Sequence, residues 1–150
     1  MTKVLFVCLG NICRSPMAEL MFKDMIKKKG LETHFFIESA GTSNEEQGNP
    51  VYPPAVKKLK EFGISASGKY ARQLTKSDYD KYDYILAMEN SNIINIKRIL
   101  GNDTNKKIFR LLDFSDNPRD IADPWYTGNF DITYNDIKEG LEAFSRYLKI

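Results

Sequence analysis

The chain has 150 residues, of which 42% are hydrophobic and 28% charged, and its formal net charge is only +2. This composition is ordinary for a globular protein, and the length suits a single domain spanning residues 1–150. The small net charge gives no reason to expect binding to nucleic acid or to a membrane surface. The apolar stretch Val4 to Leu9 is too short for a signal sequence or a membrane span. We therefore expect a cytoplasmic protein whose thiols stay reduced.

Hydrophobic patterning predicts strands that alternate with helices. Val4 to Val7 is an apolar run typical of a buried strand, and after Pro16 apolar residues recur at helical spacing. Further strands are predicted over 35–39, 82–88 and 107–111, further helices around 55–62, 93–100 and 137–148, and long loops over 43–54 and 112–128. This order predicts an α/β fold, a doubly wound four-stranded parallel sheet flanked by helices, with its ligand beyond the carboxyl ends of the strands.

The first predicted strand leads directly into an octad that ends at a helix start. The octad consists of Cys8, Leu9, Gly10, Asn11, Ile12, Cys13, Arg14 and Ser15. A short loop entering a helix leaves backbone N–H groups without partners, and these groups and the helix dipole attract an anion. Gly10 should let the backbone approach the anion closely, and Asn11 tolerates a left-handed conformation. The octad therefore predicts an oxyanion site that follows the first strand.

Cys8 and Arg14 form a Cys-x5-Arg spacing across this loop. The guanidinium of Arg14 is a planar fork of donors that can hold two phosphate oxygens. The field that binds an oxyanion also stabilises a thiolate, so Cys8 is a candidate nucleophile. A structural cysteine is the plain alternative, and the neighbouring Arg, Gly and Asn argue against it. A nucleotide-binding P-loop is the other alternative, but its Gly-Lys-Ser/Thr ending is missing.

A thiolate that attacks a phosphate monoester needs a nearby carboxylic acid to protonate the leaving oxygen. The loop over 112–128 offers the candidates Asp113, Asp116, Asp120 and Asp123. Only Asp123 precedes a proline and two aromatic residues, Trp125 and Tyr126, which could flank a flat substrate ring. An Asp-Pro pair in a loop is also a common turn former, so the residues alone leave both interpretations open.

The octad and the following proline resemble the phosphate-binding loop of the low-molecular-weight protein tyrosine phosphatases. Further stretches match that family in the same order, namely Ser39–Thr42, Ala71–Gln73, Tyr84–Met88 and Asp123–Tyr126. The resemblance implies hydrolysis of phosphotyrosine and small aryl phosphates through a phosphocysteine on Cys8, with Asp123 as general acid and then general base. The expected partners are phosphotyrosine-containing proteins or peptides, with inorganic phosphate and other oxyanions as product or inhibitors. A monomer or weak homodimer is expected.

The resemblance also implies roles for residues around the loop. Ser15 should donate to the Cys8 thiolate, while Asn11 should hold the loop through a hydrogen bond with Ser39. Further support is expected from Arg72, which matches a structural arginine of the family, and from Lys69, where many relatives have a histidine. The residues expected to line the substrate cleft are Ile12, Glu45, Asn92, Trp125 and Tyr126.

One histidine and two cysteines in one loop cannot build a zinc site without many carboxylates, so no metal or cofactor is expected.

Rival functions of the same fold can be weighed on single residues. Arsenate reductases need further cysteines downstream, and this chain has none after Cys13. Phosphoarginine phosphatases tend to have Thr at the position of Ile12, so Ile12 favours phosphotyrosine. A phosphopeptide-binding module without activity would be expected to lose the nucleophile or the acid. A redox-sensing role stays open, because Cys13 could capture the oxidised nucleophile as a disulfide. Relatives often have an aromatic residue where Glu45 and Glu46 stand, which predicts an acidic cleft wall that disfavours acidic phosphopeptides.

Overall fold

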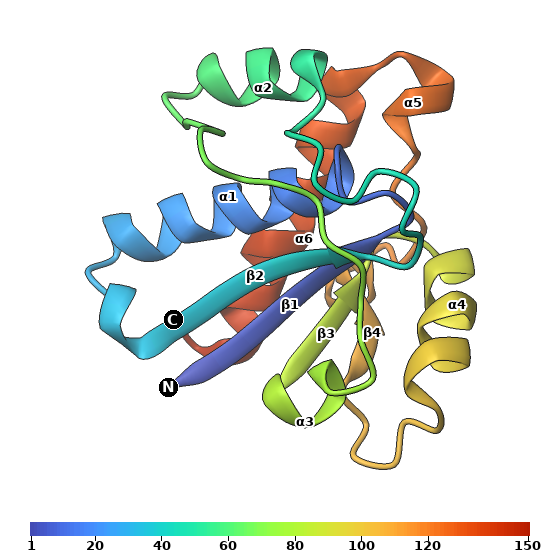
Figure 1. Cartoon of the computed structure of the whole chain (residues 1–150). Coiled ribbons are helices and arrows are strands. Elements are labelled where there is room, and N and C mark those ends of the chain that lie inside the picture. The colour runs from blue at the N-terminus through green and yellow to red at the C-terminus, as the bar shows by residue number, and fades with distance from the viewer.

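The computed structural model describes residues 1–150 and contains one parallel sheet with the strand order β2-β1-β3-β4. The strands are β1 (Thr2–Cys8), β2 (Phe35–Gly41), β3 (Tyr84–Ala87) and β4 (Ile108–Arg110). Helices α1 (Arg14–Lys28) and α6 (Phe130–Leu148) cover one face of the sheet, and α4 (Asn90–Leu100) covers the other (Figure 1). The predicted fold class is thus confirmed.

Strand β1 runs through the centre of the sheet and is buried on both sides. Val4 and Phe6 belong to the core cluster under α1 and α6, whereas Leu5 and Val7 belong to the cluster under α4. Each of these four side chains is fully buried, which explains why β1 reads as a continuous apolar run rather than an alternating one. The carboxyl end of β1 therefore delivers Cys8 to the edge of the sheet where ligands bind in such folds.

The long predicted elements are all present, most with boundaries that shift by a few residues, whereas α6 begins at Phe130, well before the predicted start at 137. The predicted helix around 55–62 is α2 (Pro53–Lys60), and the third strand is shorter than the predicted span of 82–88. Four short elements were not predicted, namely the 3-10 helices η1 (Glu32–His34) and η2 (Leu111–Phe114) and the helices α3 (Asp78–Lys81) and α5 (Pro124–Thr127). One helical turn is too short to show a hydrophobic period. None of the helices has the length and hydropathy to cross a membrane.

Candidate active site

The phosphate loop joins β1 to α1 through a left-handed residue. Asn11 has a φ of 58°, the conformation its residue type suggested. Its side-chain Nδ2 donates to Ser15 Oγ over 2.8 Å and to Ser39 Oγ over 2.9 Å. Its Oδ1 accepts the backbone N–H of Arg72 over 3.0 Å. These three bonds hold the loop open and fix the strained residue from the sheet side.

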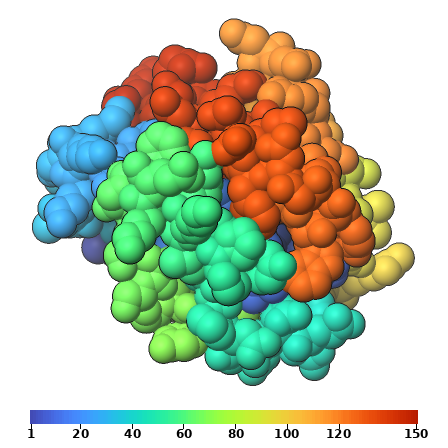
Figure 2. Space-filling view, turned by 90° about the horizontal axis from the view of Figure 1, so that it is seen from above, coloured from blue at the N-terminus to red at the C-terminus, as the bar shows by residue number.

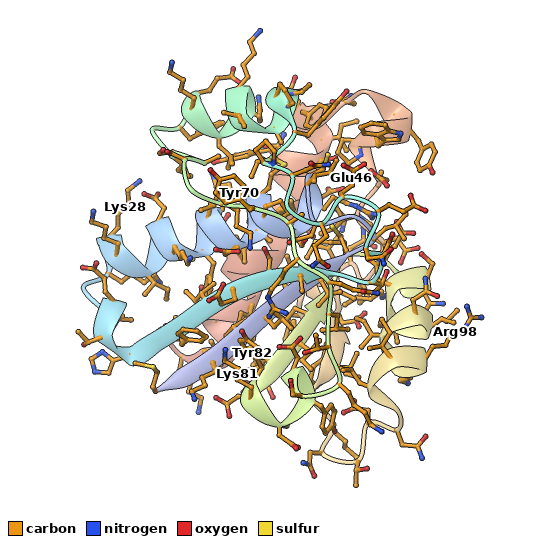
Figure 3. The ribbon with its side chains drawn as sticks, viewed as in Figure 1. Lys28, Glu46, Tyr70, Lys81, Tyr82 and Arg98 are labelled. Carbon is orange, nitrogen blue, oxygen red and sulfur yellow. The ribbon has the colours of Figure 1, made fainter.

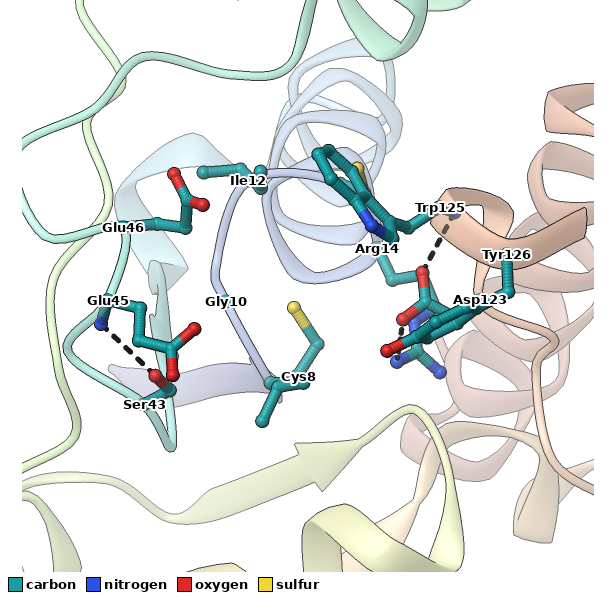
Figure 4. Close-up of a pocket in the computed structure, with 12 residues that line it drawn as sticks. Cys8, Gly10, Ile12, Arg14, Ser43, Glu45, Glu46, Asp123, Trp125 and Tyr126 are labelled. Carbon is teal, nitrogen blue, oxygen red and sulfur yellow. Dashed lines mark hydrogen bonds and ion pairs between the residues drawn. The ribbon is translucent and has the colours of Figure 1, made fainter. Parts of the chain in front are cut away.

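Cys8 is 3% exposed, and its sulfur points into a cavity (Figure 4). The Sγ atom lies 3.0 Å from Ser15 Oγ, and the backbone N–H of Asn11 donates to it over 3.3 Å. The Asn11 N–H can only donate, whereas either atom of the Ser15–Cys8 pair could be the donor. The hydrogen bond expected between Ser15 and the nucleophile is therefore present.

Arg14 begins α1 and is 2% exposed. One terminal nitrogen, Nη1, donates to the Glu89 carboxylate and, over 2.8 Å, to the Ile121 carbonyl. The other, Nη2, donates to Asp123 Oδ2 over 3.3 Å. These partners fix the plane of the guanidinium beside the cavity. Sequence reasoning missed Glu89, although its place directly after the third predicted strand could have indicated it.

Asp123 both forms a turn and lies at the cavity, which are the two roles that its sequence context left open. It is the N-cap of α5, where its Oδ1 accepts the backbone N–H of Trp125 over 3.0 Å, so it does form a turn. Its other oxygen faces Arg14, and the carboxyl group lines the same cavity as the sulfur of Cys8 (Figure 4). A carboxyl group in this place can exchange a proton with a group bound above the thiol.

The cavity has a volume of about 180 Å³ and opens on the top of the molecule. Seen from above, N-terminal atoms are visible at the bottom of a hollow between the segment before α2 and the segment around α5 (Figure 2). Its lining consists of Cys8, Leu9, Gly10, Ile12, Cys13, Arg14, Ser43, Glu45, Glu46, Asp123, Trp125 and Tyr126. Glu45 and Glu46 face Trp125 and Tyr126 across the opening (Figure 4). An acidic wall and an aromatic wall thus enclose the thiol.

A buried carboxylate supports the loop from behind. Glu19, on α1, is 2% exposed and accepts the hydroxyl of Ser39 over 2.6 Å. Its two oxygens also pair with Lys69, at 3.0 Å, and with Lys23, at 2.6 Å. Lys69 is therefore connected to Asn11 through Glu19 and Ser39. The sequence carried no signal for Glu19, since a single carboxylate on a helix usually faces water.

Arg72 contributes to the loop through its backbone, because its side chain points elsewhere. The guanidinium forms a two-pronged ion pair with Asp78, at 3.0 and 3.2 Å. Burial acts to lower the pKa of Arg72, but the bonds to Asp78 outweigh it and raise that pKa. Burial likewise acts to raise the pKa of Asp78, but Arg72 and Thr75 hold it below its usual value.

The expectation that Asn92 lines the substrate cleft is wrong. Asn92 is 1% exposed and is absent from the cavity lining. Its Oδ1 accepts the backbone N–H groups of Met88 and Glu89, at 3.2 and 3.0 Å. The side chain thus completes the capping box at the start of α4, where backbone donors would otherwise be buried without partners.

A glycine outside the octad, Gly41, is the one that packs closely against the backbone of the phosphate loop. A Cβ atom at Gly10 would lie 3.5 Å from the Cγ of Glu46, which is ordinary contact. A Cβ atom at Gly41 would lie 2.8 Å from the carbonyl oxygen of Leu9, so only glycine fits there. Gly41 is paired with Cys8 in the β1–β2 register, and the phosphate loop folds directly over it.

Cys13, the second thiol of the octad, is buried within the loop. Burial, with the negative charges of Cys8 and Asp123, raises its pKa to about 12. Cys13 is therefore a protonated thiol at neutral pH.

No group of three or more His, Cys, Asp or Glu side chains is arranged to hold a metal ion.

Comparison with known proteins agrees with the geometry. A family model described as low molecular weight phosphotyrosine protein phosphatase matches residues 3–150. The chain is 45% identical over 144 residues to the low molecular weight protein-tyrosine-phosphatase YfkJ of Bacillus subtilis, covering 95% of this chain and 92% of that protein.

Solved structures give the same result. The crystal structure of YfkJ from Bacillus subtilis superposes with a TM-score of 0.96 at 43% identity, covering 99% of this chain and 95% of that one. The structure of a Drosophila arginine phosphatase, DARP, superposes with a TM-score of 0.91 at 30% identity, covering 99% of each chain. From the family match over almost its whole length, the chain belongs to the low molecular weight phosphotyrosine protein phosphatase family.

Proposed function

We propose that this chain is a protein tyrosine phosphatase that hydrolyses phosphotyrosine and small aryl phosphates through a phosphocysteine on Cys8. The observation that carries the proposal is the convergence on one cavity of two groups of the phosphate loop, Cys8 and Arg14, with Asp123 from a distant segment. A thiol among hydrogen-bond donors, a fixed guanidinium and a carboxyl group are the three groups that cleavage of a phosphate ester by a cysteine requires.

In the first step the phosphate group binds to Arg14 and to the N–H groups of the loop. The Cys8 sulfur attacks phosphorus, so an S–P bond forms while the bond to the phenolic oxygen breaks. Asp123, protonated at this stage, donates its proton to that oxygen, and the neutral phenol leaves. Because Asp123 contacts Arg14 in the free protein, the arriving phosphate competes with it for the guanidinium.

In the second step water hydrolyses the phosphocysteine. The Asp123 carboxylate takes a proton from a water molecule, whose oxygen attacks phosphorus as the S–P bond breaks. Inorganic phosphate leaves, and Asp123 is again protonated. The donors around Cys8, Ser15 Oγ and the Asn11 N–H, stabilise the thiolate that departs.

The walls of the cavity support an aromatic substrate. Trp125 and Tyr126 offer ring faces beside the thiol, and Ile12 adds an apolar contact. We therefore propose phosphotyrosine-containing proteins or peptides as substrates, acting in a reducing compartment such as the cytoplasm, where Cys8 stays a free thiol.

Phosphoarginine is the second candidate substrate. One solved neighbour is named an arginine phosphatase, at 30% identity. Ile12 favours phosphotyrosine at the position where phosphoarginine phosphatases tend to have Thr. A redox role for Cys13 has less support, because a thiol with a pKa of about 12 is rarely the thiolate that such a reaction needs.

The test measures hydrolysis of an aryl phosphate by the wild type, Cys8→Ser and Asp123→Ala without added metal. We expect Cys8→Ser to be inactive and Asp123→Ala to lose about 10²-fold or more in rate on a poor leaving group. Activity that survives in Cys8→Ser would overturn the mechanism. Phosphotyrosine, phosphoserine and phosphoarginine peptides, compared side by side, decide the substrate class.

A further inference from the structure

Tyr52 lies outside the cavity lining, and it contacts both the phosphate loop that carries Cys8 and the segment that carries Asp123. The backbone N–H of Tyr52 donates to the Ile12 carbonyl of the phosphate loop over 2.9 Å. Its ring packs against that of Trp125, with the centroids 4.9 Å apart, and against Phe130 at 6.2 Å. We call Tyr52, Trp125 and Phe130 the aromatic clasp. Through it the start of α2 meets α5 beside the hollow of the active site (Figures 1 and 2).

The backbone of Tyr52 is held firmly by its own neighbours. Its φ and ψ of −58° and 132° are the extended conformation that a following proline favours, and Pro53 and Pro54 begin α2. Its carbonyl accepts the N–H groups of Ala55 and Val56 at 2.9 and 3.1 Å. The ring therefore projects from a rigid anchor that is also bonded to the phosphate loop.

Helix α5, on the other side of the clasp, is short and mostly exposed. Helix α5 has four residues, and of these only Pro124 is buried. Trp125 is 54% exposed, although its backbone N–H donates to Asp123 Oδ1 over 3.0 Å. A displacement of Trp125 would therefore move the carboxyl group of Asp123.

We infer that Tyr52 is a positioning residue, whose ring holds α5 so that the Asp123 carboxyl stays over the phosphate loop. The contacts form a closed circuit, from Ile12 through Tyr52 and Trp125 to Asp123, which returns to the loop through Arg14. Tyr52 does not line the cavity, so it acts on the reaction only through these neighbours. The inference rests on the proposed role of Asp123 as general acid.

The test separates proton donation from the other parts of the reaction. The wild type, Tyr52→Ala, Tyr52→Phe and Asp123→Asn are compared on p-nitrophenyl phosphate, whose leaving group hardly needs a proton, and on phenyl phosphate, whose leaving group does. The measured quantity is kcat/KM, which reports the steps up to phosphorylation of Cys8.

We expect Tyr52→Ala to lower kcat/KM about tenfold more for phenyl phosphate than for p-nitrophenyl phosphate, because a misplaced acid transfers its proton poorly. Tyr52→Phe should stay within about twofold of the wild type, since the ring makes the contacts. The matched control is Tyr70→Ala, which removes an exposed ring away from the cavity and should leave the ratio of the two substrates unchanged (Figure 3).

Fluorescence supplies a readout that does not depend on activity. Trp125 is the only tryptophan of the chain, so its emission reports on the clasp in the folded protein. Tyr52→Ala should shift the emission to longer wavelength and increase its quenching by acrylamide, whereas Tyr70→Ala should do neither. Tyr52→Leu, which keeps an apolar side chain, serves in its place should the alanine variant not fold.

The outcomes distinguish a failure of the positioning role of Tyr52 from a failure of the proposed role of Asp123. If Asp123→Asn shows no selective loss of kcat/KM on phenyl phosphate, Asp123 is not the general acid. With that loss present, a folded Tyr52→Ala that keeps the wild-type ratio of the two substrates overturns the role of Tyr52. A Tyr52→Phe as impaired as Tyr52→Ala would also contradict it, because the hydroxyl would then matter more than the ring.

Discussion

Gly41 lies outside the phosphate loop but leaves the space into which the loop's backbone packs. It is paired with Cys8 in the sheet, and the loop folds back over it so that the Leu9 carbonyl comes close to its Cα. The backbone of Gly41 is also hydrogen-bonded, since its N–H donates to the Arg72 carbonyl over 2.8 Å. A side chain at this position would therefore push the loop away from the sheet.

We expect Gly41→Ala to lower the free energy of unfolding by about 2 kcal/mol, because the added methyl group has no space between two backbone segments. Its kcat/KM on aryl phosphates should fall as the loop is displaced. The control is Gly10→Ala, whose added methyl group would make ordinary contact and should change stability by less than about 0.5 kcal/mol. Urea unfolding of both variants checks this, and equal stabilities would contradict the steric argument.

At the level of elements, an ion pair connects α3 to the segment that holds the loop. Asp78 at the start of α3 accepts the backbone N–H of Thr75 over 2.8 Å and pairs with Arg72. The backbone of Arg72 in turn bonds to Asn11 and Gly41. A helix too short to be predicted thus helps to brace the active site.

This pair should make stability depend on pH. The pKa of Asp78 is lower in the folded protein than in the unfolded chain, so the stabilisation is present above the ordinary carboxyl pKa and is lost as pH falls through the lower, folded value. We expect Asp78→Asn to be less stable than the wild type by about 2 kcal/mol at pH 7, with the difference shrinking below about pH 4.

Urea unfolding at pH 7 and pH 3 measures this difference. Other carboxyl groups also titrate in that range, so the comparison is between variants at each pH. Asp80→Asn, an exposed neighbour on α3, provides the control and should match the wild type at both values. A gap between Asp78→Asn and wild type that stays constant with pH would count against the ion pair.

At the level of the whole molecule, the charge at the cavity differs from the charge of the chain. The net charge is +2, and basic side chains such as Lys28 and Arg98 point outward from the helices (Figure 3). The mouth of the cavity nevertheless carries Glu45 and Glu46, and Asp123 lies deeper. Acidic side chains therefore predominate at the entrance, although the net charge of the protein is slightly positive.

We expect Glu45→Gln combined with Glu46→Gln to raise kcat/KM for an acidic phosphotyrosine peptide about fivefold, because repulsion at the entrance is removed. The rate on a small aryl phosphate should change less, and high salt should reduce the gain. Glu142→Gln, an exposed charge on α6 away from the cavity, tests whether net charge alone matters. Equal effects on the acidic peptide and the small substrate would remove the idea of an acidic wall.

The long elements could be predicted because their hydrophobic periods are local properties of the chain. Strand β1 is a continuous apolar run, and helices α1, α4 and α6 each bury a recurring set of apolar residues. The sequence displays both kinds of pattern directly. The one-turn helices α3 and α5 lack such a period, and their positions depend on caps such as Asp123 and on contacts with distant segments.

The same distinction applies to the site. Asn11 could be identified from the sequence because its residue type suits a left-handed turn. Asn92 was misplaced because its amide is used locally, to cap α4, rather than at the cleft. Glu19 and Glu89 went unnoticed because their partners, Ser39 and Arg14, lie far away in the chain.

The sequence by itself determined the fold class and the octad in which a thiol and a guanidinium share one loop, since both follow from residues close together in the chain. The family resemblance already implied Asp123 as the acid, but only the tertiary structure placed its carboxyl group in the same cavity as that thiol. The tertiary structure also decided that the loop packs on Gly41 and how Tyr52 connects the loop to α5. Those relations join segments that are distant in sequence, and the packing of the sheet and helices alone brings them within contact distance.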